Sequence, residues 1–197
     1  MKQEYIGDAY DYWKSFILQY LLQRKLLKRL FIDIMNDEKW KDDTIKTYAT
    51  ILNIHLHQVV KHTQPLDGSR QDYFDQTLTQ VQDGDLFLDP DIGIKTSKEK
   101  KGYLMPNELC LFLNEKQERV VSVYQHIRGQ KTEYRIDTIF HKIKENKSNT
   151  FCCSYETPMV SMLFFSTCKT RIKAIKKALS NFLGNDEIAL RRIIYHE

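Results

Sequence analysis

Short runs of apolar residues alternate with segments of helical periodicity along almost the whole chain. The runs have the length of roughly four to eight residues typical of buried strands, and they lie at 30–34, 54–60, 85–90, 119–126, 150–155, 160–167 and 192–195. The segments between them predict helices at 8–29, 37–52, 69–84, 106–117, 132–147 and 169–183. This alternation favours an α/β fold with a mainly parallel sheet and helices on both faces. The short link between the strands at 150–155 and 160–167 favours an antiparallel pair there.

The composition is that of a single domain covering residues 1–197. Hydrophobic residues make up 42% of the chain, and seven glycines and four prolines are too few for a linker or a low-complexity region. No apolar run reaches the roughly 18–20 residues of a membrane span, and the N-terminal segment lacks the pattern of a signal peptide. Four cysteines without a CxxC spacing indicate reduced thiols. We therefore expect a cytoplasmic protein without membrane contact.

The charge balance permits a nucleic-acid partner without demanding one. Thirty Lys and Arg against twenty-six Asp and Glu give a net charge of +4, and this small excess is dispersed along the chain. The segment 169–183 is a basic amphipathic helix. A solvated helix face explains it as well as a contact with phosphate does.

The strongest local signal for a site is the segment FLDPDIG at residues 87–93. An apolar strand delivers Asp89 to its end, Pro90 fixes the turn, Asp91 adds a second carboxylate, and Gly93 permits an unusual backbone angle. Two neighbouring carboxylates bind a divalent cation or act as an acid and a base. The alternative is an Asx-turn in which both aspartates cap backbone amides.

Other polar side chains also follow the predicted strands. In open α/β sheets ligands bind at the carboxyl ends of the strands, which singles out Asp33, the turn at 89–93, and Gln125, His126 and Arg128. His126 has the chemistry of a general base or a metal ligand, and Arg128 that of a phosphate clamp. A hydrogen-bonded structural histidine is the alternative for His126.

Three further groups carry weaker signals. Asp8, Asp11 and Lys14 share one helical face, where a helix cap and a surface ion pair would explain them. Arg70 opens the helix at 69–84, and a solvated helix face explains it. His55 and His57 have a spacing that suits a metal, but no third ligand accompanies them.

The order of these motifs resembles a group of uncharacterised bacterial and phage proteins of about this length. The resemblance spans residues 5–167 and rests on G-D-x-x-D-x-x-K, on Arg70 and Tyr73, on D-L-F-L-D-P-D-x-G, on Tyr103 with Glu108, and on V-x-V-Y-Q-H-x-x-R. The group has no established activity. The resemblance adds Tyr103 and Glu108 to the candidate site residues.

More distantly, the chain is similar to ribosomal-RNA adenine-N6 methyltransferases and three-cysteine-motif partner proteins. These share a Rossmann-like fold in which an early lysine, here Lys14, precedes a strand ending in an acidic residue, here Asp33. A later D-P-P-Tyr/Phe turn holds the target amino group, and Asp89 and Pro90 match its first half. Asp91 and Ile92 depart from its second half, and the turn at 34–37 lacks the glycines that approach S-adenosylmethionine.

The resemblance implies a methyltransferase-related enzyme acting on nucleic acid or a nucleotide, with a degenerate S-adenosylmethionine site. Its catalytic residues would be Lys14, Asp89, Asp91 and His126, and its substrate would contact Asp8, Asp33, Arg70, Pro90, Gly93, Tyr103, Glu108, Gln125 and Arg128. One alternative is a Mg²⁺-dependent phosphodiester nuclease or nucleotide hydrolase, with the metal on Asp89 and Asp91 and with Glu108 as a further ligand. The other is a non-catalytic binding protein of phage or defence origin. A homodimer or a protein partner is compatible with each hypothesis.

Overall fold

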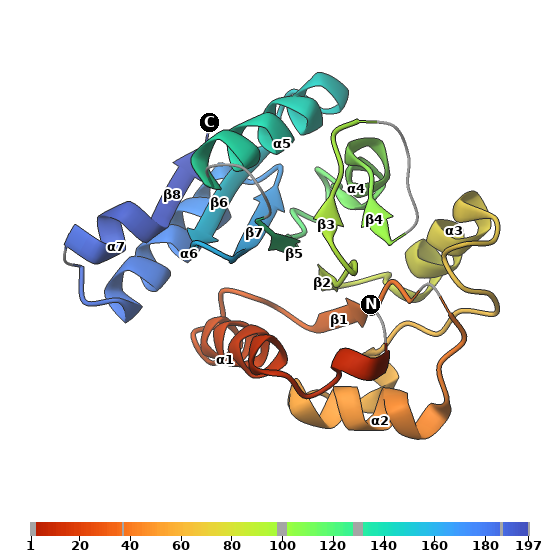
Figure 1. Cartoon of the computed structure of the whole chain (residues 1–197). Coiled ribbons are helices and arrows are strands. Elements are labelled where there is room, and N and C mark those ends of the chain that lie inside the picture. The colour runs from red at the N-terminus through yellow and green to blue at the C-terminus, as the bar shows by residue number, and fades with distance from the viewer. Residues whose placement is uncertain (1–2, 37, 98–101, 128–131, 186, 197) are drawn as a thin grey trace.

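The helices and strands follow one another along the chain largely as the apolar pattern predicts (Figure 1). This computed structural model describes residues 3–36, 38–97, 102–127, 132–185 and 187–196. The strands are β1 (Leu30–Asp33), β2 (Asp85–Leu88), β3 (Gly93–Ile94), β4 (Tyr103–Leu104), β5 (Val121–His126), β6 (Phe151–Glu156), β7 (Val160–Ser166) and β8 (Ile193–His196). The helices are α1 (Ala9–Gln23), α2 (Asp42–Ile51), α3 (Arg70–Gln80), α4 (Pro106–Phe112), α5 (Thr132–Asn146), α6 (Lys169–Phe182) and α7 (Glu187–Arg192).

Six strands form one mixed sheet in the order β1-β2-β5-β7-β6-β8. Strands β1, β2 and β5 are parallel neighbours, whereas the pairs β5–β7, β7–β6 and β6–β8 are antiparallel. The α/β class and the antiparallel pair β6–β7 are therefore confirmed, but a mainly parallel sheet is not. The short link at 157–159 accounts for the expected pair β6–β7. The sheet is mixed because β7 also pairs antiparallel with β5, and β8 pairs antiparallel with β6.

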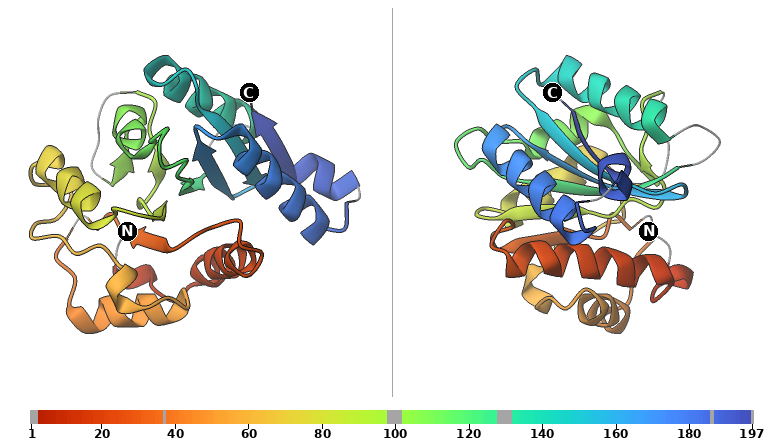
Figure 2. Two further views of the ribbon diagram at one scale, coloured as in Figure 1. Left: turned by 180° about the vertical axis from the view of Figure 1, so that it is seen from behind. Right: turned by 90° about the vertical axis from the view of Figure 1, so that its left-hand side faces the viewer.

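Helices cover both faces of the sheet (Figure 2). On one face α1, α2 and α6 bury Leu21, Tyr48 and Ile175 in a single apolar cluster. On the other face α3, α4 and α5 contribute to a second cluster. Successive strand residues alternate between the two, so the adjacent Cys152 and Cys153 belong to different clusters, and both thiols are free.

Several segments differ from their sequence-based predictions. The helix expected at 8–29 ends at Gln23, and the helix α7 was not predicted. Residues 54–60 do not form a strand, because Leu56–Gln58 is a 3₁₀ turn and the segment meets β1 at one bridge, between Ile32 and Val59. The loop expected at 91–105 includes β3 and β4, which form a short parallel ladder beside the main sheet.

A search of the described residues for a membrane span found no helix with the necessary length and apolar character.

Candidate functional site

A cavity of about 420 Å³ lies where the carboxyl ends of β2 and β5 meet the N-terminal part of α1. This volume is within the range of roughly 300–1,000 Å³ typical of small-molecule sites. The cavity is lined by Tyr5, Asp8, Tyr10, Asp11, Lys14, Asp89, Pro90, Asp91, Ile92, Tyr124 and His126. Seven of the residues singled out from the sequence thus line one space: Asp8, Asp11, Lys14, Asp89, Pro90, Asp91 and His126.

The Asp89 carboxylate is buried and held on one side only. Its Oδ2 accepts a hydrogen bond from Lys14 Nζ at 2.7 Å and another from the Tyr48 hydroxyl. Lys14 Nζ also pairs with Asp11 at 2.7 Å. Burial opposes the charge of the ammonium, but the two carboxylates outweigh it, so the pKa of Lys14 is raised. Lys14 therefore acts as a fixed cation beside Asp89 and not as a base.

Two buried polar atoms at this cavity have no hydrogen-bond partner among the residues that the structure describes. They are Asp89 Oδ1 and the Tyr124 hydroxyl oxygen. Burial and then the charge of Asp89 raise the pKa of Tyr124, so its hydroxyl keeps its proton and can donate it to a ligand. Leaving such a group unpaired costs roughly 1–3 kcal/mol, which a bound ligand would offset. The cavity thus offers one unused acceptor and one unused donor.

The first turn of α1 forms the acidic wall of the cavity. Asp8 Oδ1 accepts hydrogen bonds from the backbone N–H groups of Tyr10 and Asp11, which confirms the predicted helix cap. The expected surface ion pair is wrong, since the side chains of Lys14 and Asp11 are each only 2% exposed. Burial raises the pKa of Asp11 despite the opposing effect of Lys14. The pair is buried because α1 packs over the end of β2.

Aromatic rings form another wall. His126 and Tyr124 lie two residues apart on one face of β5, with ring centroids 4.9 Å apart. The ring of Tyr10 stands edge-on to His126 at 6.1 Å and tilted against Tyr124 at 6.2 Å. His126 and Asp91 are each half-buried and line the cavity. These rings are suited to contact a planar ligand.

Gly93 and Gln125 shape the turn behind the cavity but do not line it. Gln125 Oε1 accepts the Ile94 N–H at 2.7 Å, and its Nε2 donates to the His126 carbonyl at 2.7 Å. Gly93 has a φ of +112°, and a Cβ there would stand 2.4 Å from Gln125 Oε1. The glycine therefore allows β3 to dock on the end of β5.

The end of β1 is closed by a network of internal hydrogen bonds. Asp33 Oδ1 accepts from Met35 N and from the Tyr73 hydroxyl, and Oδ2 accepts from Thr77 Oγ1 and lies 3.1 Å from His62 Nε2. Burial raises the pKa of Asp33, but these partners outweigh it and lower the pKa overall. Asp33 is therefore committed to the fold and is not a ligand-binding carboxylate in this structure.

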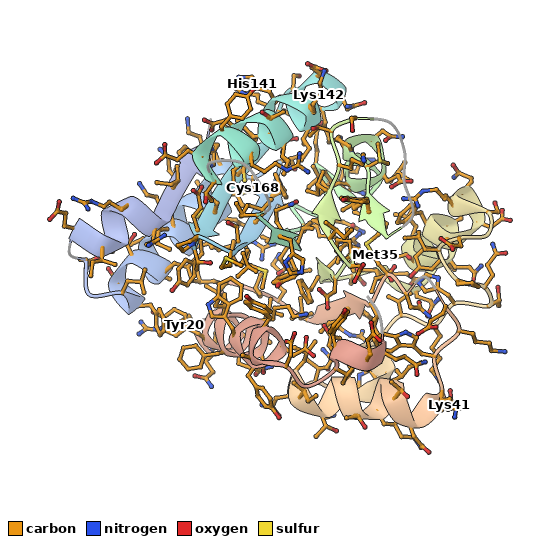
Figure 3. The ribbon with its side chains drawn as sticks, in the orientation of Figure 1. Tyr20, Met35, Lys41, His141, Lys142 and Cys168 are labelled. Atoms are coloured by element: carbon orange, nitrogen blue, oxygen red, sulfur yellow. The ribbon has the colours of Figure 1, made fainter. Side chains whose placement is uncertain are left out.

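The turn after β1 does not fit S-adenosylmethionine. Met35 has a φ of +50° at this turn, where the methyltransferases that the sequence resembles have glycine, and its side chain is fully buried in the core (Figure 3). The turn therefore carries a core side chain where a close approach of a ligand to the backbone would favour glycine, and both oxygens of the neighbouring Asp33 already have partners. We therefore derive no reaction step through this cofactor.

Arg70, Glu108 and Tyr103 come together outside the cavity. Arg70 donates two hydrogen bonds to the Glu108 carboxylate, at 2.6 and 2.7 Å, and one to the Tyr103 carbonyl at 2.8 Å. Glu108 Oε2 also accepts the Met105 N–H, at the start of α4. These contacts connect α3 to β4 and α4, so they stabilise the fold.

The metal hypothesis lacks its third ligand within the described ranges. Glu108 is paired with Arg70, away from Asp89 and Asp91, and no group of three or more His, Cys, Asp or Glu in the described part of the chain is placed to hold a metal. His55 and His57 stack on one another at 5.4 Å. Arg128 lies outside the described residues.

Sequence reasoning missed the tyrosines of the site: Tyr5, Tyr10, Tyr48 and Tyr124. The signal for Tyr124 was present, because strand alternation places it on the same face as His126. Tyr48 contacts Asp89 from a helix far away in the sequence, and no local pattern could reveal that contact.

Comparisons with known proteins gave no match to any protein family, to any curated protein or to any solved structure.

Proposed function

We propose that this cavity binds an amino-bearing nucleobase of a nucleotide or nucleic acid, and that the chain is a methyltransferase-related protein whose base-binding half is retained. The observation that carries the proposal is the unpartnered Oδ1 of buried Asp89, at the first position of the D-P-D turn. A buried carboxylate oxygen needs an N–H or O–H donor. In the methyltransferases that the chain resembles, the equivalent aspartate accepts from the target amino group.

The other features of the cavity support a base as the donor-bearing ligand. Adenine and cytosine each present an amino donor next to a ring-nitrogen acceptor, which matches the unused acceptor of Asp89 and the unused donor of Tyr124. The rings of Tyr10, Tyr124 and His126 offer aromatic contacts to its plane. Lys14 and Tyr48 hold the other oxygen of Asp89, so its orientation is fixed before a ligand arrives.

The fold supports the same relationship. The three parallel strands β1, β2 and β5 bring their carboxyl ends to the edge where the cavity lies, as in Rossmann-like folds. Antiparallel β7 then lies between β5 and β6, which run in the same direction. Because the turn at Met35 does not fit S-adenosylmethionine, the proposal extends to recognition of the base and not to a methyl-transfer step.

Isothermal titration calorimetry tests the proposal with pairs of ligands that differ only in the amino group. Adenosine monophosphate should bind at least tenfold more tightly than purine riboside monophosphate, and cytidine monophosphate more tightly than its analogue without the amino group. Equal affinities within both pairs would contradict the role of Asp89. Binding of Mg²⁺ alone that is lost in Asp91→Asn would favour the nuclease or hydrolase alternative instead.

A further inference from the structure

Two segments that are far apart in the sequence carry basic residues and no acidic residue. Residues 12–32 and 157–185 contain ten Lys and Arg and no Asp or Glu, whereas the rest of the chain has twenty basic and twenty-six acidic residues. The net charge of +4 is therefore the sum of +10 in these two segments and −6 in the rest of the chain.

The fold places these two segments side by side. Helices α1 and α6 lie antiparallel, with the Tyr20 hydroxyl donating to the Ala178 carbonyl at 3.0 Å and Arg171 Nη2 to the Leu26 carbonyl at 2.9 Å. Figure 3 shows Tyr20 on the side of α1 that faces α6. The ring of Phe182 closes the contact, 4.9 Å from the ring of Tyr20.

Two of the ten basic side chains are neutralised internally, since Lys14 pairs with Asp89 and Arg171 with Asp85. Six of the other eight are exposed, and among these Arg24, Arg29 and Lys173 lie over the rings of Tyr20, Phe31 and Tyr195. No carboxylate within the described residues pairs with the exposed side chains Arg24, Lys25, Lys28, Arg29, Lys173 and Lys177. These six side chains, on or next to α1 and α6, together with Tyr12, Phe16 and Phe182, are called the α1–α6 surface below.

Exposed aromatic side chains connect this basic region to the cavity. Tyr12 and Phe16 are 59% and 57% exposed and lie one turn apart on α1, between the cavity at its N-terminus and the basic residues at its C-terminus. The ring of Phe16 packs against Phe182 of α6 at 5.2 Å. Exposed aromatics beside a positively charged track are the features that bind single-stranded nucleic acid.

We infer that the α1–α6 surface binds a single-stranded nucleic acid, with phosphates on its basic residues, bases against Tyr12 and Phe16, and one base in the cavity. This inference rests on the proposed function, and of the two ligands named there it selects the nucleic acid over the free nucleotide. Helix α1 is about 22 Å long, so a strand with one base in the cavity would run along this length to reach the basic residues beyond the end of the helix. Insertion into a lipid surface fits less well, because the apolar faces of both helices are already buried in the core.

Fluorescence anisotropy with a labelled 12-nucleotide single strand tests this surface. Changing Arg24, Lys28, Lys173 and Lys177 together to Gln should weaken binding at least tenfold and reduce the slope of log affinity against log salt by about 2–3. The matched control changes four exposed lysines elsewhere, Lys41, Lys46, Lys61 and Lys116, to Gln and should behave like the unmodified protein. Comparing the affinities for an RNA strand and a DNA strand of the same sequence shows which of the two nucleic acids the surface prefers.

Aromatic contacts are tested separately. Tyr12→Ala should weaken binding roughly 5- to 150-fold per lost stacking contact, whereas Tyr134→Ala on α5, 67% exposed, should not. Adenosine monophosphate should bind all these variants as it binds the unmodified protein, since the cavity is unchanged.

Several results would contradict the inference that the α1–α6 surface binds a single strand. If the basic variant and its control bind the strand equally while the mononucleotide still binds, the surface is wrong and the cavity proposal stands. Binding only to vesicles of anionic lipid, or a dimer that covers Tyr12 and Phe16 and excludes the strand, would also contradict it. If the unmodified protein binds the strand but no mononucleotide, the cavity proposal fails instead.

Discussion

At the scale of single residues, the site is built around a charged network that the protein only partly satisfies. Lys14 and Tyr48 donate hydrogen bonds to Asp89 Oδ2, and Lys14 also pairs with Asp11. Asp89 Oδ1 and the Tyr124 hydroxyl have no partner among the described residues. The first set supports the fold, and the second set is available to a ligand. Substitutions at the two sets should therefore have opposite effects on stability and binding.

Tyr124→Phe separates the two roles. Removing a buried, unpaired hydroxyl should leave the free energy of unfolding unchanged or raise it by up to about 1 kcal/mol, because a desolvation cost disappears. The same change should weaken nucleotide binding about tenfold. Urea denaturation and calorimetry measure both quantities. The control Tyr48→Phe removes a hydroxyl that donates to Asp89 and should destabilise by about 1.5–3 kcal/mol.

Lys14→Met leaves two buried carboxylates, Asp89 and Asp11, without their cation. We expect a loss of about 3–5 kcal/mol in the free energy of unfolding at pH 7. Lys46→Met breaks an ion pair whose side chains are 59% and 92% exposed, and it should cost less than about 1 kcal/mol. Similar losses in both variants would show that the network around Asp89 contributes no more than a surface pair.

Asp33 gives stability a dependence on acid pH. Its pKa is lowered in the folded state, so the unfolded chain binds more protons below the ordinary value of 3.8, and stability falls as the pH falls through that range. Asp33→Asn should be less stable at pH 7 and lose less stability between pH 4 and about pH 2. Thermal unfolding across this range measures the difference, and Asp43→Asn, at an exposed carboxylate, should keep the slope of the unmodified protein.

At the scale of helices and strands, local patterns predicted most of the elements. Strand β2 is a run of four buried residues, and α1 begins at the predicted cap Asp8, so each is visible within a few positions of the sequence. Residues 54–60 were misread because their apolar residues cover the edge of β1 at a single bridge instead of extending the sheet. The direction of β7 and β8 depends on which strands they join, and a pattern within one segment does not contain that information.

Gly93→Ala tests how the turn after β2 is built. The change imposes a positive φ on alanine and places its Cβ 2.4 Å from Gln125 Oε1, so we expect a loss of at least about 2 kcal/mol in stability and weaker nucleotide binding. Gly184→Ala also imposes a positive φ, but nothing lies within 4 Å of its Cβ. Its cost should be about 1 kcal/mol, with binding unchanged. Equal losses would mean that Gln125 moves aside freely.

At the scale of the whole molecule, the fold divides the predicted site residues into two sets. Those on β2, its turn and the start of α1 converge on the cavity, because parallel strands end at a common edge. Arg70, Tyr103, Glu108 and Asp33 are also candidate site residues in the sequence, yet they bind one another or their neighbours. Only the three-dimensional arrangement distinguishes a charge that serves the fold from one left for a ligand.

The distribution of charge likewise depends on the three-dimensional arrangement of the helices. The excess of basic residues is dispersed along the sequence, and the antiparallel contact of α1 with α6 brings the two segments without acidic residues together. The absence of acidic residues from 12–32 and 157–185 was visible in the sequence, but the adjacency of these segments was not.

The crystal structure of the protein with adenosine monophosphate tests the central claim most directly. We expect the amino nitrogen of the base within about 2.7–3.2 Å of Asp89 Oδ1, with the Tyr124 hydroxyl bonded to the adjacent ring nitrogen and Lys14 still paired with Asp89 Oδ2. A nucleotide bound elsewhere, or one in the cavity whose base does not contact Asp89 Oδ1, would contradict the account.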